Sequence, residues 1–249
     1  MGISIFGLGY VGAVTAVCLA RDGHDVIGLD VNPDKVAFVN GGSSPIIESG
    51  LGGLLVDGVQ AGKIRATTDA AASVACSDLS LISVGTPSSP PGSTDLTYVH
   101  GVCKDIGAAI YQQGKKHVVV LRSTVPPVTL EECQEIFEEA AQVKSIHVAF
   151  NPEFLRKGSA IKTYDQPPYT IIGTNDLEAG GAIRKMYAAV EAPVIVNKPK
   201  MAEMVKFVAN AWHVAKMSFA NEIGKIAQGF GIDGSESWIL LFKYKVVCI

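Results

Sequence analysis

A glycine-rich turn between an expected strand and an expected helix constrains the fold of this chain most strongly. Residues 3–30 read ISIFGLGYVGAVTAVCLARDGHDVIGLD, with Gly7, Gly9 and Gly12 in the spacing G-x-G-x-x-G. Four apolar or small residues precede the turn, a helical period follows it, and Asp30 closes the next apolar run. This order predicts a strand-helix-strand unit with parallel strands.

The rest of the chain repeats the alternation of short apolar runs and helical-period segments. The segments typical of strands are 3–6, 25–30, 79–85, 117–123, 146–150, 169–173 and 193–196. The segments typical of helices are 11–21, 33–40, 96–112, 130–141, 177–190 and a long one that opens after Pro199. We therefore predict an α/β fold of the Rossmann type, with a doubly wound parallel sheet over residues 1–197 and a second domain over 198–249.

Composition and charge exclude several classes of protein. A chain of 249 residues that is 48% hydrophobic and 18% charged can bury a sizeable core. A formal net charge of -3 with scattered Lys and Arg residues gives no electrostatic case for a nucleic-acid partner. No apolar run is long enough to cross a bilayer, and no signal-peptide pattern opens the chain, so we expect no membrane association and a cytoplasmic location.

The five cysteines are an odd number at irregular spacings, without a C-x-x-C pair. This pattern argues against a disulfide framework and against a zinc site. We expect reduced thiols, most of them buried, and no bound metal.

The glycine-rich turn predicts a dinucleotide site. Gly7 would permit the tight turn, Gly9 would let the backbone approach a pyrophosphate, and Gly12 would let helix and strand pack closely. Asp30 would accept hydrogen bonds from the adenosine ribose and repel a 2′-phosphate, with Lys35 as the nearest basic candidate. NAD is therefore favoured over NADP. A glycine-rich turn without a ligand is the alternative, and the flanking strand, helix and acidic residue argue against it.

Three further segments follow expected strands: SVGTPSS with Thr86, RSTVPP with Thr124, and NPEFLRKGSAIKTYD with Glu153. In an open α/β sheet, ligands bind beyond the carboxyl ends of the strands, so these segments are candidates for a reactive site. Each residue also has an ordinary structural explanation. The threonines can form turns or cap helices, and Glu153 can complement a helix dipole in the first turn.

The segment 202–228 is apolar almost all round but carries a set of polar residues, which are Lys206, Asn210, His213 and Asn221. At about 3.6 residues per turn they return to one face, which predicts a polar stripe on a mostly buried helix. A cation and an amide four residues apart can hold a substrate hydroxyl and stabilise a developing alkoxide. The alternatives are a solvated face, a core histidine with satisfied hydrogen bonds, and an asparagine bonded to nearby backbone.

These motifs together resemble the UDP-glucose/GDP-mannose dehydrogenase family. The motifs are FGLGYVGAV, SVGTP, RSTVPP, NPEFLR, DQPPYTIIG and AEMVKFVANAWHVAKMSFANEIG, in this order over most of residues 1–234. The resemblance implies an NAD-dependent oxidoreductase that oxidises a nucleotide sugar twice at C6, through a thiohemiacetal and a thioester on a catalytic cysteine. The wording around AIKTYDQPPYTIIG and NAWHVAK favours GDP-mannose over UDP-glucose.

The resemblance also implies roles for individual residues. Besides the three glycines, it implies NAD contacts at Tyr10, Val11, Asp30, Lys35, Thr86 and Thr124. It implies sugar-nucleotide contacts at Lys206, Asn210, His213 and Asn221. The expected catalytic set is Thr124, Glu153, Lys206 and Asn210, with Lys206 and Asn210 steadying the oxyanion and Glu153 assisting water or proton transfer. It further implies a homodimer built on the long helix.

Two departures from the family pattern affect the substrate side. PEFLRK stands where the family usually has PEFLRE, so Lys157 replaces a carboxylate of the substrate site, where its ammonium can instead meet a phosphate. The family segment G-G-x-C-x-P-K-D, which carries the nucleophilic cysteine, appears nowhere, and we interpret Cys248 as incidental. We therefore expect residues 198–249 to be the truncated start of a helical middle domain, in a chain with little or no activity.

Three alternative functions remain open from the sequence. The first is UDP-glucose as the substrate, and the second is a hydroxyacid dehydrogenase that needs no cysteine. The third is a non-catalytic module that binds NAD or pairs helices. Turnover of any substrate separates the third from the others.

Overall fold

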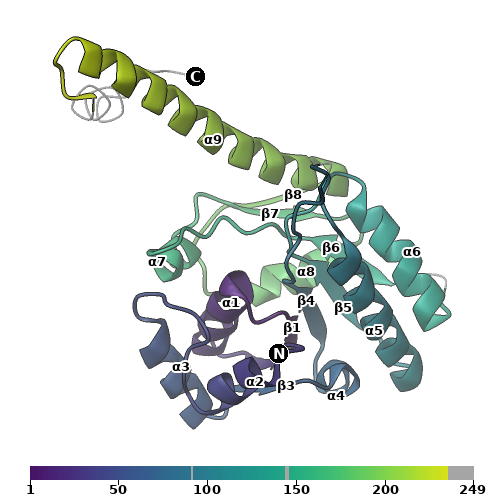
Figure 1. Cartoon of the computed structure of the whole chain (residues 1–249). Helices are drawn as coiled ribbons and strands as arrows, with labels where there is room; N and C mark the ends of the chain where they lie inside the picture. Colours follow the sequence, from purple (N-terminus) through teal and green to yellow (C-terminus); the bar gives the residue numbers. More distant parts are fainter. Residues whose placement is uncertain (91, 144–145, 235–249) are drawn as a thin grey trace. The chain divides into compact units, whose positions relative to one another are not determined.

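The computed structural model of the chain describes residues 1–90, 92–143 and 146–234. The chain divides into two compact units, Met1–Met204 and Val205–Ile249. The first unit contains an eight-stranded sheet in the order β3-β2-β1-β4-β5-β6-β7-β8 (Figure 1). The described part of the second unit consists mainly of the continuation of one long helix. The predicted Rossmann-type α/β fold with a long helix after it is confirmed.

The elements have the following bounds. The strands are β1 (Gly2–Phe6), β2 (Asp25–Leu29), β3 (Ile64–Thr67), β4 (Leu79–Ile82), β5 (Val118–Leu121), β6 (His147–Phe150), β7 (Thr170–Gly173) and β8 (Val194–Asn197). The helices are α1 (Tyr10–Arg21), α2 (Pro33–Asn40), α3 (Leu51–Gln60), α4 (Ala70–Ala75), α5 (Thr97–Gln113), α6 (Thr129–Ala141), α7 (Ala160–Asp165), α8 (Leu177–Met186) and α9 (Pro199–Gly229).

The strand order creates a switch point beside β1. β1 pairs in parallel with β2 on one side and with β4 on the other, so successive crossovers run outward in both directions from this strand. Helices α1, α3 and α7 accordingly pack together, and α4, α5 and α6 form a second group (Figure 1). Strands β4 and β5, LSLI and VVVL, are buried throughout because helices cover both faces of the sheet. The loops after β1 and β4 therefore lie at the switch point, the usual ligand site of such sheets.

Four elements escaped sequence analysis: α3, β3, α4 and α7. Helix α3 reads LGGLLVDGVQ, and its three glycines disfavour a helix by intrinsic propensity. Its buried Leu51 and Leu55 pack in the core, which overrides that propensity. Strand β3 and helices α4 and α7 have only four to six residues each, too few to show a period.

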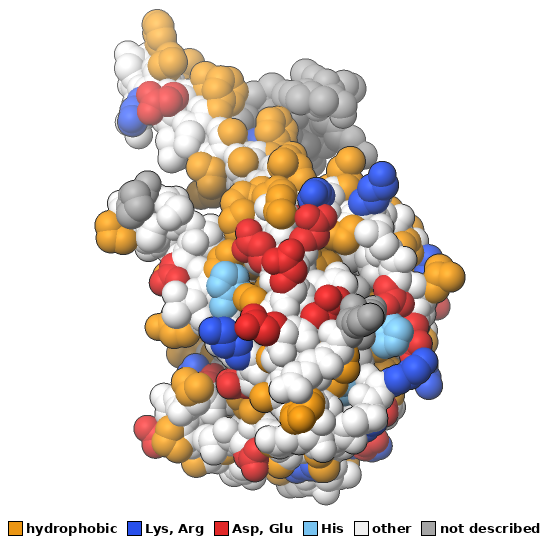
Figure 2. Space-filling view, turned by 90° about the vertical axis from the view of Figure 1, so that its right-hand side faces the viewer, with side chains coloured by type: hydrophobic (Ala, Val, Ile, Leu, Met, Phe, Trp, Pro, Cys, Tyr) orange, Lys and Arg blue, Asp and Glu red, His pale blue; other side chains and the backbone are white. Residues whose placement is uncertain are grey.

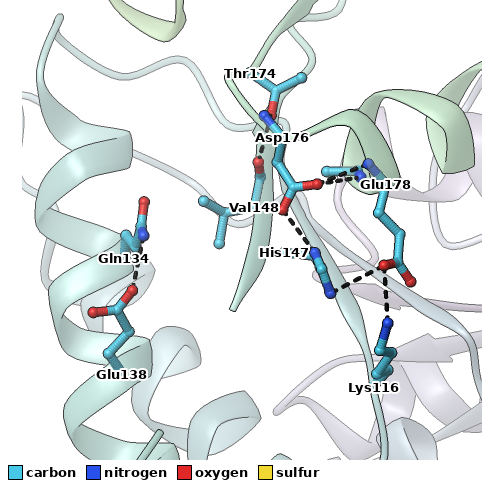
Figure 3. A network of polar contacts seen from close by, with 9 residues as sticks. Lys116, Gln134, Glu138, His147, Val148, Thr174, Asp176 and Glu178 are labelled. Carbon is cyan, nitrogen blue, oxygen red and sulfur yellow. Dashed lines mark hydrogen bonds and ion pairs between the residues drawn. The ribbon is translucent and has the colours of Figure 1, made fainter. Parts of the chain in front are cut away.

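One strand pair departs from the predicted parallel sheet, because β7 runs antiparallel to β6 with Phe150 opposite Gly173. Continuing that register outward brings His147 opposite Asp176, and the His147 Nδ1 atom lies 2.7 Å from Asp176 Oδ2 (Figure 3). The other oxygen of Asp176 accepts from the amides of Glu178 and Ala179 and so caps α8. This network fastens the antiparallel pair at the amino end of β6, at the opposite edge of the sheet from the loops after β1 and β4.

The described thiols agree with the expectation of reduced cysteines, most of them buried. Cys18, Cys103 and Cys133 are free and buried, whereas Cys76 is free but exposed at the end of α4. Burial raises the pKa of the Cys18 thiol to about 12, so this thiol is an unreactive part of the core. Cys248 lies outside the described residues.

Two searches of the described residues give negative results. No group of His, Cys, Asp and Glu in the described ranges is arranged to hold a metal ion. None of the helices described has the length and apolarity that crossing a membrane requires. Acidic side chains gather on the face that Figure 2 turns to the viewer. The sequence of α6 alone contains five glutamates.

Candidate functional site

The glycine-rich turn has the geometry that its spacing predicts. Gly7 has φ +100°, which side chains rarely adopt, and its amide donates to the Leu29 carbonyl oxygen at 2.7 Å. A Cβ atom at Gly12 would lie 1.8 Å from the Gly7 carbonyl oxygen, so only glycine allows this close packing. A Cβ atom at Gly9 would meet nothing within 4 Å. The chain therefore leaves open space in front of Gly9, as the approach of a ligand would require.

Helix α1 begins at Tyr10 without a side-chain cap from any described residue. Its first amides point out of the turn, where the helix dipole favours a negative group. A phosphate group at this position would satisfy these amides.

Asp30 at the end of β2 is buried, with 7% of its surface exposed. Its Oδ2 atom accepts from the Leu8 amide at 2.9 Å and from Lys35 Nζ at 3.1 Å, and Oδ1 accepts from the Asn32 amide at 3.0 Å. Burial alone would raise the pKa of Asp30, but these hydrogen bonds outweigh it and hold the pKa below its usual range. Asp30 is therefore ionised at neutral pH and also fastens the glycine-rich turn to the second strand.

Thr86 and Thr124 connect the loops that follow β4 and β5. The Thr86 hydroxyl donates to the Thr124 carbonyl oxygen at 2.8 Å, and Ser123 Oγ donates to the Val84 carbonyl oxygen at 2.7 Å. The structure thus brings the two predicted threonines together at the carboxyl edge of the sheet. The Thr86 bond also agrees with the simpler explanation of a turn-forming threonine.

Glu153 and Lys157 belong to the segment between β6 and α7. The Glu153 carboxylate accepts from the Leu155 amide at 2.7 Å, which stabilises the turn that carries it. Lys157 is exposed, and its Nζ atom lies 5.9 Å from the centre of the Tyr10 ring. This contact places the Lys157 ammonium beside the first residue of α1, next to the glycine-rich turn.

Three polar residues that support this edge were missed by sequence analysis. Arg122 Nη1 donates to Asn151 Oδ1 at 2.8 Å and to the Tyr187 hydroxyl at 2.6 Å, and all three side chains are buried. Burial raises the pKa of Tyr187, so its hydroxyl stays protonated and donates to Asn151 Oδ1. The cluster fixes Asn151 two residues before Glu153. An arginine directly after the apolar run VVVL was the available signal.

The fully buried Glu203 was also missed. Its two carboxylate oxygens accept from the Val128 and Leu130 amides, both at 2.8 Å. Val128 has φ 87°, a strained value for a β-branched residue, and precedes the first residue of α6. Burial raises the pKa of Glu203, although the two amides oppose this. Glu203 therefore caps α6 and holds the loop that starts at Thr124. The sequence signal that could have identified Glu203 is a carboxylate among apolar neighbours in AEMV.

The polar residues of α9 occupy one face, as predicted, but that face is mostly exposed. A continuous helix puts Lys206, Asn210, His213 and Asn221 within an arc of about 80° at 100° per residue. Lys206 is buried, with 6% of its surface exposed, whereas the other three are exposed. The expectation of a mostly buried helix is wrong for this chain, because a single helix cannot cover its own faces. We call these four residues the polar stripe.

Comparisons with known proteins agree with this geometry. A model described as UDP-glucose/GDP-mannose dehydrogenase family, NAD binding domain, matches residues 1–191. The chain belongs to this family. The central domain of the same family matches residues 200–239.

Individual relatives give the same picture. The chain is 48% identical over 240 residues to GDP-mannose 6-dehydrogenase of Pseudomonas aeruginosa, covering 95% of this chain and 55% of the relative. It is 36% identical to UDP-glucose 6-dehydrogenase of Rhizobium meliloti, covering 94% of this chain and 57% of the relative. A crystal structure of a ternary complex of GDP-mannose dehydrogenase from Pseudomonas aeruginosa superposes with a TM-score of 0.95 and 46% identity, over 98% of this chain and 57% of that one. The chain thus spans about half the length of the relatives it matches.

Proposed function

We propose that this chain is the NAD-binding part of a nucleotide-sugar 6-dehydrogenase whose substrate is GDP-mannose. The observation that carries the proposal is the open glycine-rich turn beside an ionised Asp30, in a chain that the NAD-binding family model matches over residues 1–191. The choice of GDP-mannose is supported by relatives with that activity at 46–48% identity, against 36–41% for UDP-glucose dehydrogenases.

The residues at the turn fit NAD. The amides at the start of α1 would hold the diphosphate in the open space before Gly9, with Tyr10 and Val11 as the first helical residues. Each carboxylate oxygen accepts up to two hydrogen bonds, and among the described residues Asp30 Oδ1 accepts only from Asn32. One position on Asp30 therefore suits a ribose hydroxyl, while its charge disfavours the 2′-phosphate of NADP.

The substrate side would use the residues that the family resemblance implies. When bound, NAD supplies a hydride acceptor for the C6 hydroxyl of the sugar. Lys206 and Asn210 would stabilise the oxyanion, with Glu153 and Thr124 moving a proton or positioning water. The nucleotide-contacting set would be Lys157, Lys206, Asn210, His213 and Asn221. The 249 residues contain no G-G-x-C-x-P-K-D segment, so we propose that this polypeptide alone binds NAD without completing two oxidations.

We further propose that the protein is a cytoplasmic homodimer formed through α9. Opposite the polar stripe, the part of α9 that belongs to the second unit exposes four apolar side chains at about 200–240° from Lys206 by helical spacing. These side chains, which we call the apolar seam, are Val208, Trp212, Phe219 and Ile226, each 48–59% exposed. An exposed apolar row on one helix face is the pattern by which two helices pair.

The NAD assignment is tested by titrating NAD into the 249-residue polypeptide and its Asp30→Ala variant in a calorimeter. The variant should lose about 1.5–3 kcal/mol of binding free energy, the scale of a hydrogen bond to a charged group. Asp34→Ala, which removes an exposed carboxylate of α2, is the matched control and should bind as the parent does. Equal affinity of all three proteins would contradict the assignment.

A further inference from the structure

A carboxylate outside all the predicted site residues joins the two halves of the candidate site. Glu48 lies in the loop before α3 and is half-buried. Its Oε2 atom accepts from the Tyr10 hydroxyl and from the Gly158 amide at 2.8 Å, and its Oε1 atom accepts from the Ala160 amide at 3.0 Å. Three donors from two distant chain segments therefore converge on one side chain.

The protonation states strengthen these contacts. The hydrogen bond from Tyr10, followed by that from the Ala160 amide, lowers the pKa of Glu48, so the carboxylate is ionised at neutral pH. Burial and the bond to Glu48 raise the pKa of Tyr10 to about 12, so the phenol remains a donor. Hydrogen bonds that an ionised acceptor receives are stronger than neutral ones.

The two segments that Glu48 joins have different expected ligands. Tyr10 is the first residue of α1 and directly follows Gly9, where the dinucleotide would approach. Gly158 and Ala160 end the segment that carries Glu153 and Lys157, which we assign to the substrate. The Lys157 ammonium also lies over the Tyr10 ring, so a second contact crosses the same junction.

We propose that Glu48 is a positioning residue whose carboxylate couples the glycine-rich turn to the 153–160 segment, so that the two segments become ordered together. Binding of NAD at the turn then orders the segment that carries Glu153, and loosening that segment weakens NAD. The inference rests on the proposed function, because NAD is the ligand that this coupling involves.

The test uses three variants of the 249-residue polypeptide. Glu48→Gln leaves one acceptor oxygen for three donors and adds a donor of its own. Tyr10→Phe removes the phenol bonds to Glu48 and to the Arg156 carbonyl oxygen, and it leaves the Glu48 bonds to both amides intact. Glu191→Gln is the control, because it removes an exposed carboxylate on the loop before β8.

Two readouts are needed: the NAD dissociation constant by calorimetry, and hydrogen exchange of the Gly158 and Ala160 amides with and without NAD. We expect Glu48→Gln and Tyr10→Phe to weaken NAD binding about tenfold, the effect of roughly one charge-assisted hydrogen bond. NAD should slow exchange at both amides in the parent and in Glu191→Gln. In the two other variants that protection should be lost.

Exchange measured without NAD separates failure of the inference from failure of the proposed function. Tyr10→Phe should speed exchange at Gly158 even in the ligand-free protein, although the two residues are far apart in the chain. Unchanged exchange there overturns the coupling, whether or not the protein binds NAD. NAD affinity within twofold of the parent in both Glu48→Gln and Tyr10→Phe also overturns it.

Discussion

The carboxyl edge of the sheet and the helix α9 present their predicted site residues in different ways. At the sheet edge the backbone makes the site, and the nearby chain already fixes Asp30 through the amides of Leu8 and Asn32. On α9 the site consists of side chains alone, and three of the four residues of the polar stripe are exposed. The comparison indicates that a cofactor site built from local backbone is complete within one unit. A site built from a row of exposed side chains on one helix needs a second surface to complete it.

The largest effect should come from a methyl group at Gly12. This substitution tests whether the backbone at the carboxyl edge of the sheet is packed too tightly to accept a side chain. Gly12→Ala would place Cβ 1.8 Å from the Gly7 carbonyl oxygen. We expect loss of NAD binding and about 3 kcal/mol of stability, the upper range for overpacking. Gly9→Ala, whose Cβ meets nothing within 4 Å, should keep its stability and lose only NAD affinity. Urea unfolding with NAD titration measures both, and equal destabilisation by the two variants would contradict the account.

Acidification should destabilise the first unit through His117, a residue remote from the glycine-rich turn. His117 is buried, with Nε2 2.7 Å from Ser80 Oγ. Burial, then the Lys115 charge, lowers the pKa of His117 from 6.5 to about 4. In the unfolded chain, His117 becomes protonated below pH 6.5. In the folded chain, it becomes protonated only near pH 4. Unfolding free energy should therefore fall by about 3 kcal/mol between these values.

Urea unfolding at pH 6.5 and pH 4.5 checks the effect of His117. His117→Gln, which keeps a polar side chain for Ser80, should lose much less stability over this interval. If the parent and the variant lose equal stability, other groups cause the acid sensitivity of the sheet unit.

The apolar seam offers a way to change α9 while leaving the sheet edge intact. Trp212→Glu places a charge in the row of exposed apolar side chains and should weaken the dimer by about 2 kcal/mol, the scale of an interface hot spot. NAD affinity should not change, because the glycine-rich turn lies in the first unit. Light scattering over a concentration series measures dimerisation. A parent protein that is a monodisperse monomer would contradict the proposed homodimer.

The smallest effect should come from Lys157, an exposed ammonium at the junction of the two site halves. In a chimera completed by the C-terminal half of a relative, Lys157→Glu should weaken sugar-nucleotide binding by about 0.2–1 kcal/mol if the ammonium attracts a phosphate. Lys157→Met, of similar length without charge, should lie between the parent and Lys157→Glu. Tighter binding by Lys157→Glu would mean that the lysine is a defect at this position.

Sequence analysis was most successful where function depends on local backbone. The spacing of Gly7, Gly9 and Gly12 between a strand and a helix predicted the turn, because each glycine answers a steric requirement set by neighbouring residues. The alternation of strands and helices likewise predicted the sheet. Helix α3 was missed because core packing of Leu51 and Leu55 outweighs its glycine content.

The contacts that support the site could not be predicted, because they join segments far apart in the sequence. Glu48 meets Gly158, and Glu203 meets Val128, only after the sheet has brought their loops together. In neither pair does the sequence around one residue indicate which residue it will contact. The binding roles assigned to Thr86, Thr124, Glu153 and the polar stripe stay predictions, since geometry alone places them without a ligand.

The central claim is that the 249-residue polypeptide holds a complete NAD site and an incomplete substrate site. The most direct measurement is NADH formation from GDP-mannose, and separately from UDP-glucose, with NAD titration by calorimetry on the same sample. We predict saturable NAD binding and no sustained NADH production, because the 249 residues do not contain the family segment that carries the nucleophilic cysteine. Sustained formation of about two NADH per sugar would contradict it, since the second oxidation needs a thiolate that this account does not supply.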